Sequence, residues 1–167
     1  KKFKISLVPQ IGGFFADLSA EDNLNSIGEI LIKDTKSRKL KIEELISKFE
    51  LDAVRKVEAK FLSGGMKRRL VISMSLLGEP DILLMDEPLA ALDPQTIQML
   101  QTIIIKLQFE YNLTMLITDH QARDLLVVCD KAIILSNSKI VAEGTPNELI
   151  RNENATKYYF GDNFKFK

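Results

Sequence analysis

The hydrophobic pattern of this chain changes period several times, and the short-period stretches predict strands. Residues 3–8 alternate between apolar and polar side chains, as a half-buried strand does, and Pro9 ends the alternation. Residues 82–85 and 113–118 are short, nearly continuous apolar runs, which are typical of strands buried on both faces of a parallel sheet. Two further strands are expected later in the chain, at 132–135 and 139–142.

Helical periodicity fills the segments between the predicted strands. Apolar side chains recur every three or four residues in the segments 20–31, 40–49, 64–77, 94–107 and 121–128. Asp93 and Pro94 form an N-cap with proline at the first helical position, and TPNE at 145–148 combines a capping box with proline. Strands buried on both faces are typical of the parallel sheet of an α/β fold.

The helix expected at 64–77 is preceded by a motif that can bind an anion, LSGGM at 62–66. Ser63 is a natural N-cap, because its hydroxyl can accept a hydrogen bond from the free amides of the first turn. Gly64 and Gly65 allow another surface to approach those amides closely, and free N–H groups at a helix N-terminus favour an anion. By itself, however, the motif also fits a capped helix without a ligand.

The apolar run at 82–85 ends in two adjacent acids, Asp86 and Glu87, and then in Pro88. Ligands of open α/β sheets bind at the carboxyl ends of the strands, which is where these acids are expected to lie. Apolar strands that end in acids are common in α/β proteins, so this second motif alone is not specific either.

The two motifs in this order, followed by LAALD at 89–93, are far more specific than either alone. Here the sequence resembles the nucleotide-binding domain of ABC ATPases: residues 63–66 match the family signature, 83–87 match Walker B and 91–93 match the D-loop. The resemblance implies a P-loop NTPase-like α/β fold with an added α-helical subdomain. It also divides the chain into a Q-loop strand and loop, a helical signature subdomain, a RecA-like core and a C-terminal extension, at residues 1–15, 16–78, 79–150 and 151–167.

The resemblance implies that the protein binds ATP and Mg2+. Asp86 would hold the magnesium ion directly or through water, and Glu87 would be the general base for attack of water on the γ-phosphate. Gln10, which alone would be a surface loop residue, matches the Q-loop glutamine that approaches the magnesium and links the nucleotide to the transporter contact. His120, the only histidine, matches the switch histidine that reaches the γ-phosphate, although a lone histidine is usually structural.

Each ATP site of this family is shared head-to-tail between two subunits. Ser63, Gly64 and Gly65 would therefore close on the nucleotide bound by the opposite subunit, and Asp93 would lie at the dimer seam. The implied partners are a second copy of the ATPase subunit, which makes a homodimer, and transmembrane permease subunits.

Two other groups of residues have open or simpler interpretations. Phe14 and Phe15 follow two glycines, and their rings either tuck into the core or form a docking groove for a partner helix, since exposed aromatic rings are enriched at interfaces. The basic run at 67–69 is interpreted as a solvated helix face rather than as a phosphate-binding cluster.

Composition narrows the partners and the compartment. Basic and acidic residues are balanced at 23 each, so no basic excess suggests nucleic-acid binding. No apolar run approaches the ~20 residues of a membrane helix. Cys129 is the only cysteine and is expected to be a buried free thiol in a reducing cytoplasm. Together with the resemblance, which implies permease subunits that span the bilayer, this gives the expectation of a cytoplasmic protein that is peripheral, on the inner face of the cytoplasmic membrane.

The 167 residues contain no G-x-x-x-x-G-K-[ST] sequence, which would supply the amide cradle and the lysine for the β- and γ-phosphates. In ABC ATPases that loop precedes the Q-loop, and this chain starts just before Gln10, so we expect an N-terminally truncated domain. The isolated polypeptide is expected to hydrolyse ATP at a background rate only.

Features near the end of the chain resemble, more narrowly, the ATPases of bacterial lipopolysaccharide-export transporters. These features are LITDHQARDLL at 116–126 and the tail YYFGDNF at 158–164. The resemblance implies that ATP-driven closure of two subunits extracts lipopolysaccharide from the inner membrane. Branched-chain amino-acid importers have ATPases with a similar tail and remain an alternative, as does a non-catalytic remnant without Walker A. A DNA-repair ATPase is disfavoured, because residues 10–63 form a compact insertion instead of a long coiled coil.

Overall fold

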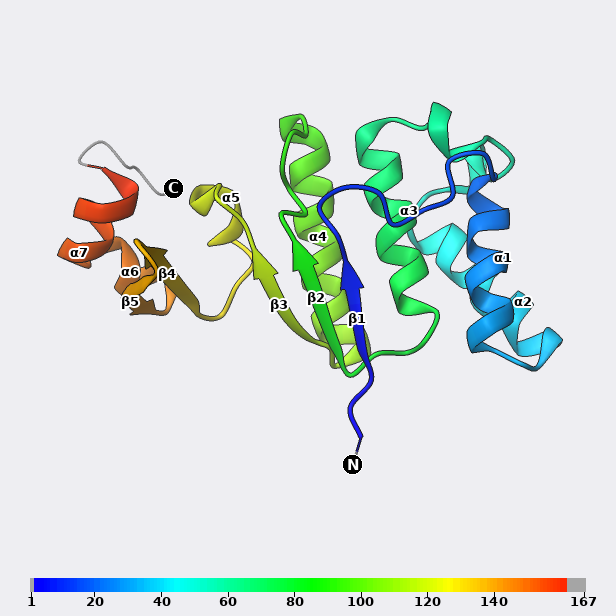
Figure 1. The fold of residues 1–167 in the computed structure, drawn as a ribbon, viewed down its shortest axis with the longest axis horizontal. Helices are drawn as coiled ribbons and strands as arrows, with labels where there is room; N and C mark the ends of the chain where they lie inside the picture. The colour runs from blue at the N-terminus through cyan, green and yellow to red at the C-terminus, as the bar shows by residue number, and fades with distance from the viewer. Residues whose placement is uncertain (1, 162–167) are drawn as a thin grey trace. The chain divides into compact units, whose positions relative to one another are not determined.

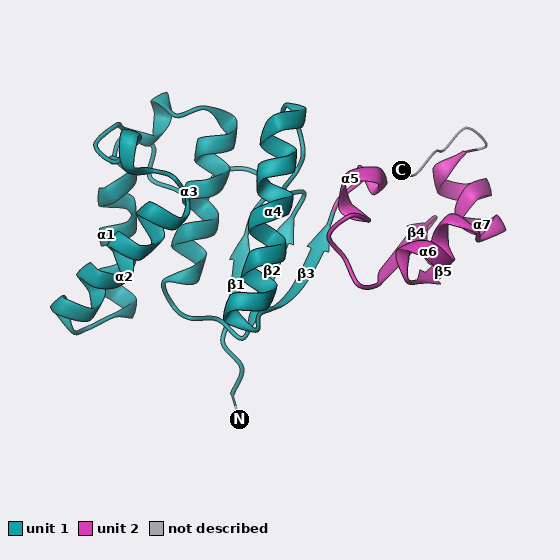
Figure 2. Ribbon diagram, turned by 180° about the vertical axis from the view of Figure 1, so that it is seen from behind, with its two compact units in different colours: residues 1–118 teal, residues 119–167 magenta. Residues whose placement is uncertain are grey.

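The computed structural model describes residues 2–161 of the 167-residue chain. The chain forms two compact units, residues 1–118 and residues 119–167, each with a hydrophobic core of its own (Figure 2). The end of the tail motif, residues 162–164, lies outside the described residues.

A three-stranded parallel sheet organises the first unit. Its strands, in order across the sheet, are β1 (Ile5–Val8), β2 (Ile82–Asp86) and β3 (Thr114–Thr118) (Figure 1). Val8 pairs with Met85, and Asp86 pairs with Thr118, so the three strands end close to one another. All three predicted strands and their parallel pairing are confirmed, although β1 is shorter than predicted.

Helices cover one face of this sheet. α4 (Pro94–Tyr111) lies over this face, in front of the strands in Figure 2, and α3 (Gly64–Leu76) packs against β1 and against the first turn of α4. Leu83 and Met85 of β2 point to this covered face and are completely buried. One part of the core of the unit therefore lies between β2 and these two helices, and another part, which includes Leu24, Leu45 and Phe49, lies in the helical segment between β1 and β2.

The other face of the sheet is apolar and largely open in the described part of the chain. Leu7, Leu84 and Leu116 are paired across the three strands and form a row on this face. Leu7 is 60% exposed and Leu116 is 62% exposed. The expectation of burial on both faces is therefore wrong for β3 and holds only in part for β2, because the described helices of the unit pack on one side.

The segment between β1 and β2 is helical. In chain order, its elements are α1 (Ala20–Leu31), α2 (Thr35–Lys48), the short 3-10 helices η1 (Asp52–Val54) and η2 (Ala59–Phe61), and α3. The side chains of Ser19 and Asp34 cap α1 and α2 by accepting hydrogen bonds from backbone amides of the first turn. The Asp34 cap is the reason that α2 begins earlier than the predicted helix at 40–49.

The basic run on α3 is not the solvated face that we expect from the sequence. Arg69 is only 7% exposed, and its Nη1 donates to the carbonyl oxygens of Phe49 at 2.9 Å and Glu50 at 3.2 Å. Arg68 is half-buried. A guanidinium can be buried where several carbonyl groups accept hydrogen bonds from its N–H groups. These acceptors lie too far from Arg69 in the sequence to be predicted.

The first turn of α3 packs against the first turn of α4 at a glycine. Gly65 is buried, and a Cβ atom added to it would meet Cγ2 of Thr96 at 2.5 Å. Gly64 is exposed, and a Cβ atom there would meet Cδ2 of Leu92 at 3.5 Å, an ordinary contact. The group that approaches Gly65 closely is therefore Thr96 of the same chain and not a ligand. Gly64 is the glycine that remains accessible.

The second unit is a β-hairpin with short helices packed on one of its faces. In chain order, its elements are α5 (Ala122–Leu125), β4 (Ala132–Ser136), β5 (Lys139–Gly144), α6 (Pro146–Ile150), α7 (Glu153–Ala155) and η3 (Thr156–Phe160). β4 and β5 pair antiparallel, and Leu126, Ile134 and Leu149 lie in the core. The two predicted strands are confirmed, and so is the capping box formed by Thr145 and Glu148.

Two expectations for the second unit are wrong in detail. The predicted helix at 121–128 is confined to α5, because the amide of Val128 bonds to the carbonyl of Leu125 at 3.0 Å and turns the chain toward the hairpin. Cys129 is free, as expected, but it is half-buried instead of buried. Its partial burial raises the pKa of the thiol.

A carboxylate at the start of α1 holds the helical segment of the first unit together. Oε1 of Glu21 accepts a hydrogen bond from Nη2 of Arg55 at 2.7 Å, and its other oxygen pairs with Lys56. The same Arg55 nitrogen reaches Glu43 of α2, also at 2.7 Å. The hydrogen bonds from Arg55 and Lys56 lower the pKa of Glu21 from 4.5 to about 2.

The packing at Gly65 predicts a contrast between the two signature glycines. Gly65→Ala should lower the free energy of unfolding by about 1–3 kcal/mol, because its methyl group overpacks against Thr96. Gly64→Ala should change it by less than about 1 kcal/mol. Adding Thr96→Ser to Gly65→Ala removes the clashing methyl group, keeps the hydroxyl, and should recover part of the loss. Urea unfolding gives the free energy of unfolding of the unsubstituted protein, the two single variants and the double variant. Equal effects of the two single substitutions would contradict the packing at Gly65.

The lowered pKa of Glu21 predicts a pH dependence of stability. Because the folded-state value lies below the unfolded-state value, the contribution of Glu21 is complete above pH 4.5 and is lost as the pH falls toward 2. Solvent screening limits this contribution to about 1–2 kcal/mol. Glu21→Gln should therefore flatten the acid limb of the stability curve, which urea unfolding at several pH values measures. Parallel curves for the two proteins would show that Glu21 makes no such contribution.

Candidate active site

The carboxyl ends of the three parallel strands form the edge at which the predicted site residues gather. β1 ends at Val8, two residues before Gln10, and β2 ends at Asp86, next to Glu87. Thr118 is the last residue of β3 and pairs with Asp86. The parallel register therefore brings two polar loops and a strand end to one place, as open α/β sheets do at their ligand sites.

Gln10 and Glu87 are in direct contact although 77 positions separate them in the sequence. Nε2 of Gln10 donates a hydrogen bond to Oε2 of Glu87 at 2.6 Å. Gln10 is exposed and Glu87 is half-buried, so the pair lies at the surface of the edge. The amide thus fixes one oxygen of the carboxylate and leaves the amide oxygen of Gln10 as an acceptor for another group.

Asp86 presents an exposed carboxylate at the same edge. Oδ1 of Asp86 accepts a hydrogen bond from Oγ1 of Thr118 at 2.6 Å, which orients the carboxyl group. Within residues 2–161, no cluster of three or more His, Cys, Asp or Glu side chains could hold a metal ion. Magnesium commonly uses only one or two protein carboxylates and takes its other ligands from phosphates and water. The residues at this edge therefore fit a magnesium–nucleotide complex better than a metal held by protein alone.

The backbone at Glu87 is held in an unfavourable conformation. Its φ angle is +43°, in the left-handed region that a residue with a side chain rarely adopts. Its amide donates to the carbonyl of Thr118 at 2.8 Å, and its carbonyl accepts from the amide of Ala90 at 3.2 Å. Such a conformation persists only where its surroundings hold it. Positive φ angles also occur at Glu79 and Ala91, so the angle at Glu87 supports a functional role only together with the hydrogen bonds that surround it.

Arg68 contacts this site and was not predicted from the sequence. Its Nη1 donates to the carbonyl of Pro9 at 2.7 Å, and its Nη2 donates to the carbonyls of Gln10 at 2.9 Å and Glu87 at 3.2 Å. All three acceptors are main-chain atoms, which carry no residue-type signal. The only hint in the sequence is the place of Arg68 just after the signature motif.

The signature and D-loop residues lie together at the first turns of α3 and α4. Oγ of Ser63 accepts from the amide of Met66 at 3.2 Å, and Ser63 and Gly64 are exposed. The carboxylate of Asp93 accepts from the hydroxyl of Thr96 at 2.5 Å and from its amide at 3.0 Å. These two hydrogen bonds hold the pKa of Asp93 below its ordinary value. Asp93 is thus the predicted N-cap, and its ionised form is favoured.

The two candidate docking residues differ in exposure. Phe14 is half-buried, whereas Phe15 is 50% exposed. The backbone of Phe15 is fixed by Asn23, whose side chain accepts from the Phe15 amide at 2.7 Å and donates to the Phe15 carbonyl at 2.9 Å. Because Asn23 is completely buried, Phe15 presents its ring from a well-anchored loop.

His120 belongs to the second unit. Its side chain is 64% exposed, and Nδ1 lies 3.9 Å from Oδ1 of Asp119. Its carbonyl accepts a hydrogen bond from the hydroxyl of Tyr159 at 2.8 Å. The imidazole is therefore accessible on its own unit, and its role as a switch histidine stays a prediction.

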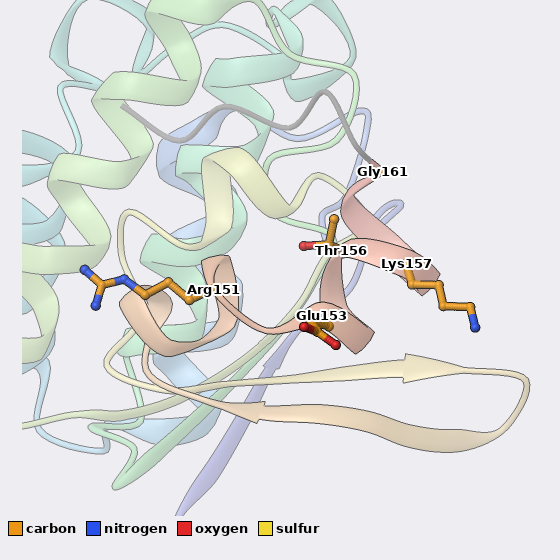
Figure 3. A pocket seen from close by; sticks show the side chains of 5 residues that line it. All are labelled: Arg151, Glu153, Thr156, Lys157 and Gly161. Carbon is orange, nitrogen blue, oxygen red and sulfur yellow. The ribbon is translucent and has the colours of Figure 1, made fainter.

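A pocket of about 420 Å³ also lies in the second unit, lined by Arg151, Glu153, Thr156, Lys157 and Gly161. Figure 3 shows that Arg151 and Lys157 extend away from it in opposite directions. Because charged groups do not converge in this pocket, it is a weaker candidate for a functional site than the strand edge of the first unit.

Comparison with known proteins agrees with these motifs. Residues 1–90 match the profile of the ABC transporter family. The chain is 35% identical over 164 residues to the lipopolysaccharide export system ATP-binding protein LptB of Escherichia coli. The alignment covers 96% of this chain and 67% of LptB. The chain is 36% identical over 162 residues to LptB of Haemophilus influenzae, with the same coverage of both proteins.

A solved structure has the same fold. It is cbiO1 from Clostridium perfringens, part of the ABC transporter complex cbiONQ, which matches with a TM-score of 0.81 at 22% identity. That match covers 92% of this chain and 62% of the other, so the chain spans about two thirds of the length of the proteins it resembles. The predicted fold class is confirmed.

None of the helices in residues 2–161 combines the length and the apolar character that crossing a bilayer requires. The profile match, the two relatives and the order of the motifs agree with one another. This chain therefore belongs to the ABC transporter family, among its ATP-binding subunits.

Proposed function

We propose that this chain is the major part of an ATP-hydrolysing subunit that powers an ABC transporter for lipopolysaccharide export. The observation that carries the proposal is the 2.6 Å hydrogen bond between Gln10 and Glu87, beside Asp86 at the carboxyl edge of the sheet. Membership of the ABC transporter family supports ATP as the substrate. The resemblance to LptB of two bacteria supports lipopolysaccharide as the cargo.

Glu87 is proposed as the general base of ATP hydrolysis. A water molecule forms a bond to the γ-phosphorus while the bond from that phosphorus to the β,γ-bridging oxygen breaks, which gives ADP and inorganic phosphate. The carboxylate of Glu87 accepts the proton that this water loses. Gln10 assists because its amide fixes one carboxylate oxygen and so sets the direction in which the other can accept the proton.

Asp86 and the free amide oxygen of Gln10 would hold Mg2+ together with the nucleotide phosphates. Bound magnesium would neutralise charge on the β- and γ-phosphates. Thr118 orients the Asp86 carboxylate for this role through its hydroxyl. His120 is proposed to contact the γ-phosphate as a switch histidine, from its exposed place in the second unit.

The signature turn is proposed to serve a second copy of the subunit. Ser63 and Gly64 are exposed at the N-terminus of the long helix α3, where free amides favour a phosphate. In a head-to-tail homodimer they would close on the nucleotide of the partner, with Gly65 held in place by Thr96 and with Asp93 at the seam. Phe15 is proposed to contact a helix of the membrane-spanning permease, at the cytoplasmic face of the membrane.

A hybrid protein tests the catalytic proposal. In it, this chain replaces the matching 164 residues of E. coli LptB, and the rest of LptB is proposed to supply the phosphate cradle that the 167 residues lack. The hybrid should hydrolyse ATP, and Glu87→Gln should lower its kcat by about 10²–10⁴-fold. The 167 residues alone should remain at background.

Glu79→Gln is the matched control, since Glu79 is an exposed acid with a φ angle of +48° before β2, away from the proposed site. It should leave kcat unchanged. A Glu87→Gln hybrid as active as its parent would contradict the assignment, and so would a comparable rate from the isolated chain.

Cells of E. coli depleted of LptB test the cargo and the docking residue. The hybrid should restore lipopolysaccharide at the cell surface, and Phe15→Asp should abolish this rescue while the purified variant still hydrolyses ATP. Phe109→Asp, which changes a ring on α4 that is 80% exposed, should affect neither readout. A hybrid that hydrolyses ATP without restoring lipopolysaccharide export would contradict the cargo and favour another transporter, such as a branched-chain amino-acid importer.

A further inference from the structure

One guanidinium group joins the two loops that carry the proposed catalytic residues. Arg68 Nη1 lies 2.7 Å from the carbonyl oxygen of Pro9, and Nη2 lies 2.9 Å from that of Gln10 and 3.2 Å from that of Glu87. Pro9 and Gln10 follow β1, whereas Glu87 follows β2. The side chain therefore links the backbones of both loops at the residues whose side chains meet.

The geometry of this contact requires arginine. A guanidinium presents five N–H donors in a planar fork, so it can serve three carbonyl acceptors in fixed directions. A lysine ammonium is a compact group on a flexible stem and would keep fewer of these bonds in one geometry. Arg68 is also half-buried, which strengthens its hydrogen bonds relative to those of a solvated side chain.

The three bonds act on the same two residues that form the catalytic pair. Gln10 is held through its carbonyl by Arg68, and its side chain in turn holds the carboxylate of Glu87 at 2.6 Å. Glu87 is held through its carbonyl in a left-handed conformation with a φ angle of +43°. A residue kept in a strained conformation relaxes when one of its restraints is lost. Loss of Arg68 would thus release the Gln10 loop and the Glu87 backbone together.

We infer that Arg68 is a positioning residue that aligns Gln10 with Glu87 for ATP hydrolysis. This inference rests on the proposed function, because it assigns Arg68 a part in the same reaction. Arg68 lies on α3, the helix whose first turn carries Ser63 and Gly64. The signature turn and the catalytic pair are therefore attached to one rigid element, and a displacement of α3 would move both.

The neighbouring residues of α3 separate this role from a merely structural one. Arg69 also donates to two carbonyls, but these belong to Phe49 and Glu50, away from the strand edge. Lys67 donates to the carbonyl of Lys60 at 3.0 Å. Variants of Arg69 and Lys67 therefore report what the loss of a basic side chain from α3 does without disturbing the two loops.

The first experiment uses the full 167-residue chain and needs no nucleotide. In a 15N-labelled sample, the side-chain amide of Gln10 is identified by its absence in Gln10→Ala, and Glu87→Gln gives its position without the carboxylate partner. Arg68→Gln should shift this resonance toward the Glu87→Gln position and speed its hydrogen exchange by at least about tenfold. Arg68→Lys should recover part of the shift.

Two variants are the controls for this spectrum. Lys67→Gln should leave the Gln10 resonance unchanged. Arg69→Lys should lower the thermal midpoint but also leave the resonance unchanged. Should Arg68→Gln fail to fold, as judged by circular dichroism, Arg68→Lys carries the test alone. An unshifted Gln10 resonance in a folded Arg68 variant would overturn the inference.

The second experiment measures catalysis in the LptB hybrid. Arg68→Gln should lower kcat by up to about 10²-fold with little change in KM, because it misplaces the base without removing a contact to ATP. A shifted Gln10 resonance with unchanged kcat would overturn the positioning role. A parent hybrid without any ATP hydrolysis would count against the proposed function, while the Gln10 spectrum would still decide whether Arg68 aligns the pair.

Discussion

The candidate site depends on the parallel pairing of β2 with the strands on both of its sides. Because the three strands run in one direction, the loops that follow them leave the sheet at a single edge. Gln10 and Glu87 come from loops far apart in the sequence, and this pairing brings the two loops to the same edge, where the side chains form a hydrogen bond. An antiparallel arrangement would place the two loops at opposite ends of the sheet and leave no shared site. The proposed chemistry therefore depends first on the parallel direction of the strands and only then on the individual side chains.

α3 adds a second level of organisation. Its first turn offers an exposed serine and glycine, its middle supplies Arg68 to the two loops, and Arg69 anchors it to the end of α2 through the carbonyl of Phe49. One helix thus connects a surface proposed to face a partner subunit with the residues proposed to activate water. The strained backbone at Glu87 fits this arrangement, since Thr118 accepts from its amide while Ala90 and Arg68 both donate to its carbonyl.

Local signals in the sequence were enough for the strands, for the motifs and for the caps at Ser63, Asp93 and Thr145, but not for the cap at Asp34. Apolar runs located β2 and β3, and Asp93 with Pro94 located the start of α4. What the sequence could not reveal depends on contacts between distant segments. The burial of Arg69 and the hydrogen bonds of Arg68 to the two loops both involve main-chain carbonyls, which every residue has. The open face of the sheet does not follow from the apolar runs themselves, because a continuous apolar run predicts burial but does not say which neighbours provide it.

Gly65 and Thr96 illustrate how a contact within the chain can restrict the substitutions that evolution accepts. The space above Gly65 is already filled by the methyl group of Thr96, and the hydroxyl of the same threonine donates a hydrogen bond to Asp93. A side chain at position 65 lowers the stability of the fold unless position 96 has become smaller, and serine is the replacement that keeps the hydroxyl. The two positions should therefore drift as a pair among related proteins, even though one lies in the signature and the other on the helix behind it. If Gly65 does not vary among related proteins, its packing against Thr96 would explain this as well as nucleotide binding would.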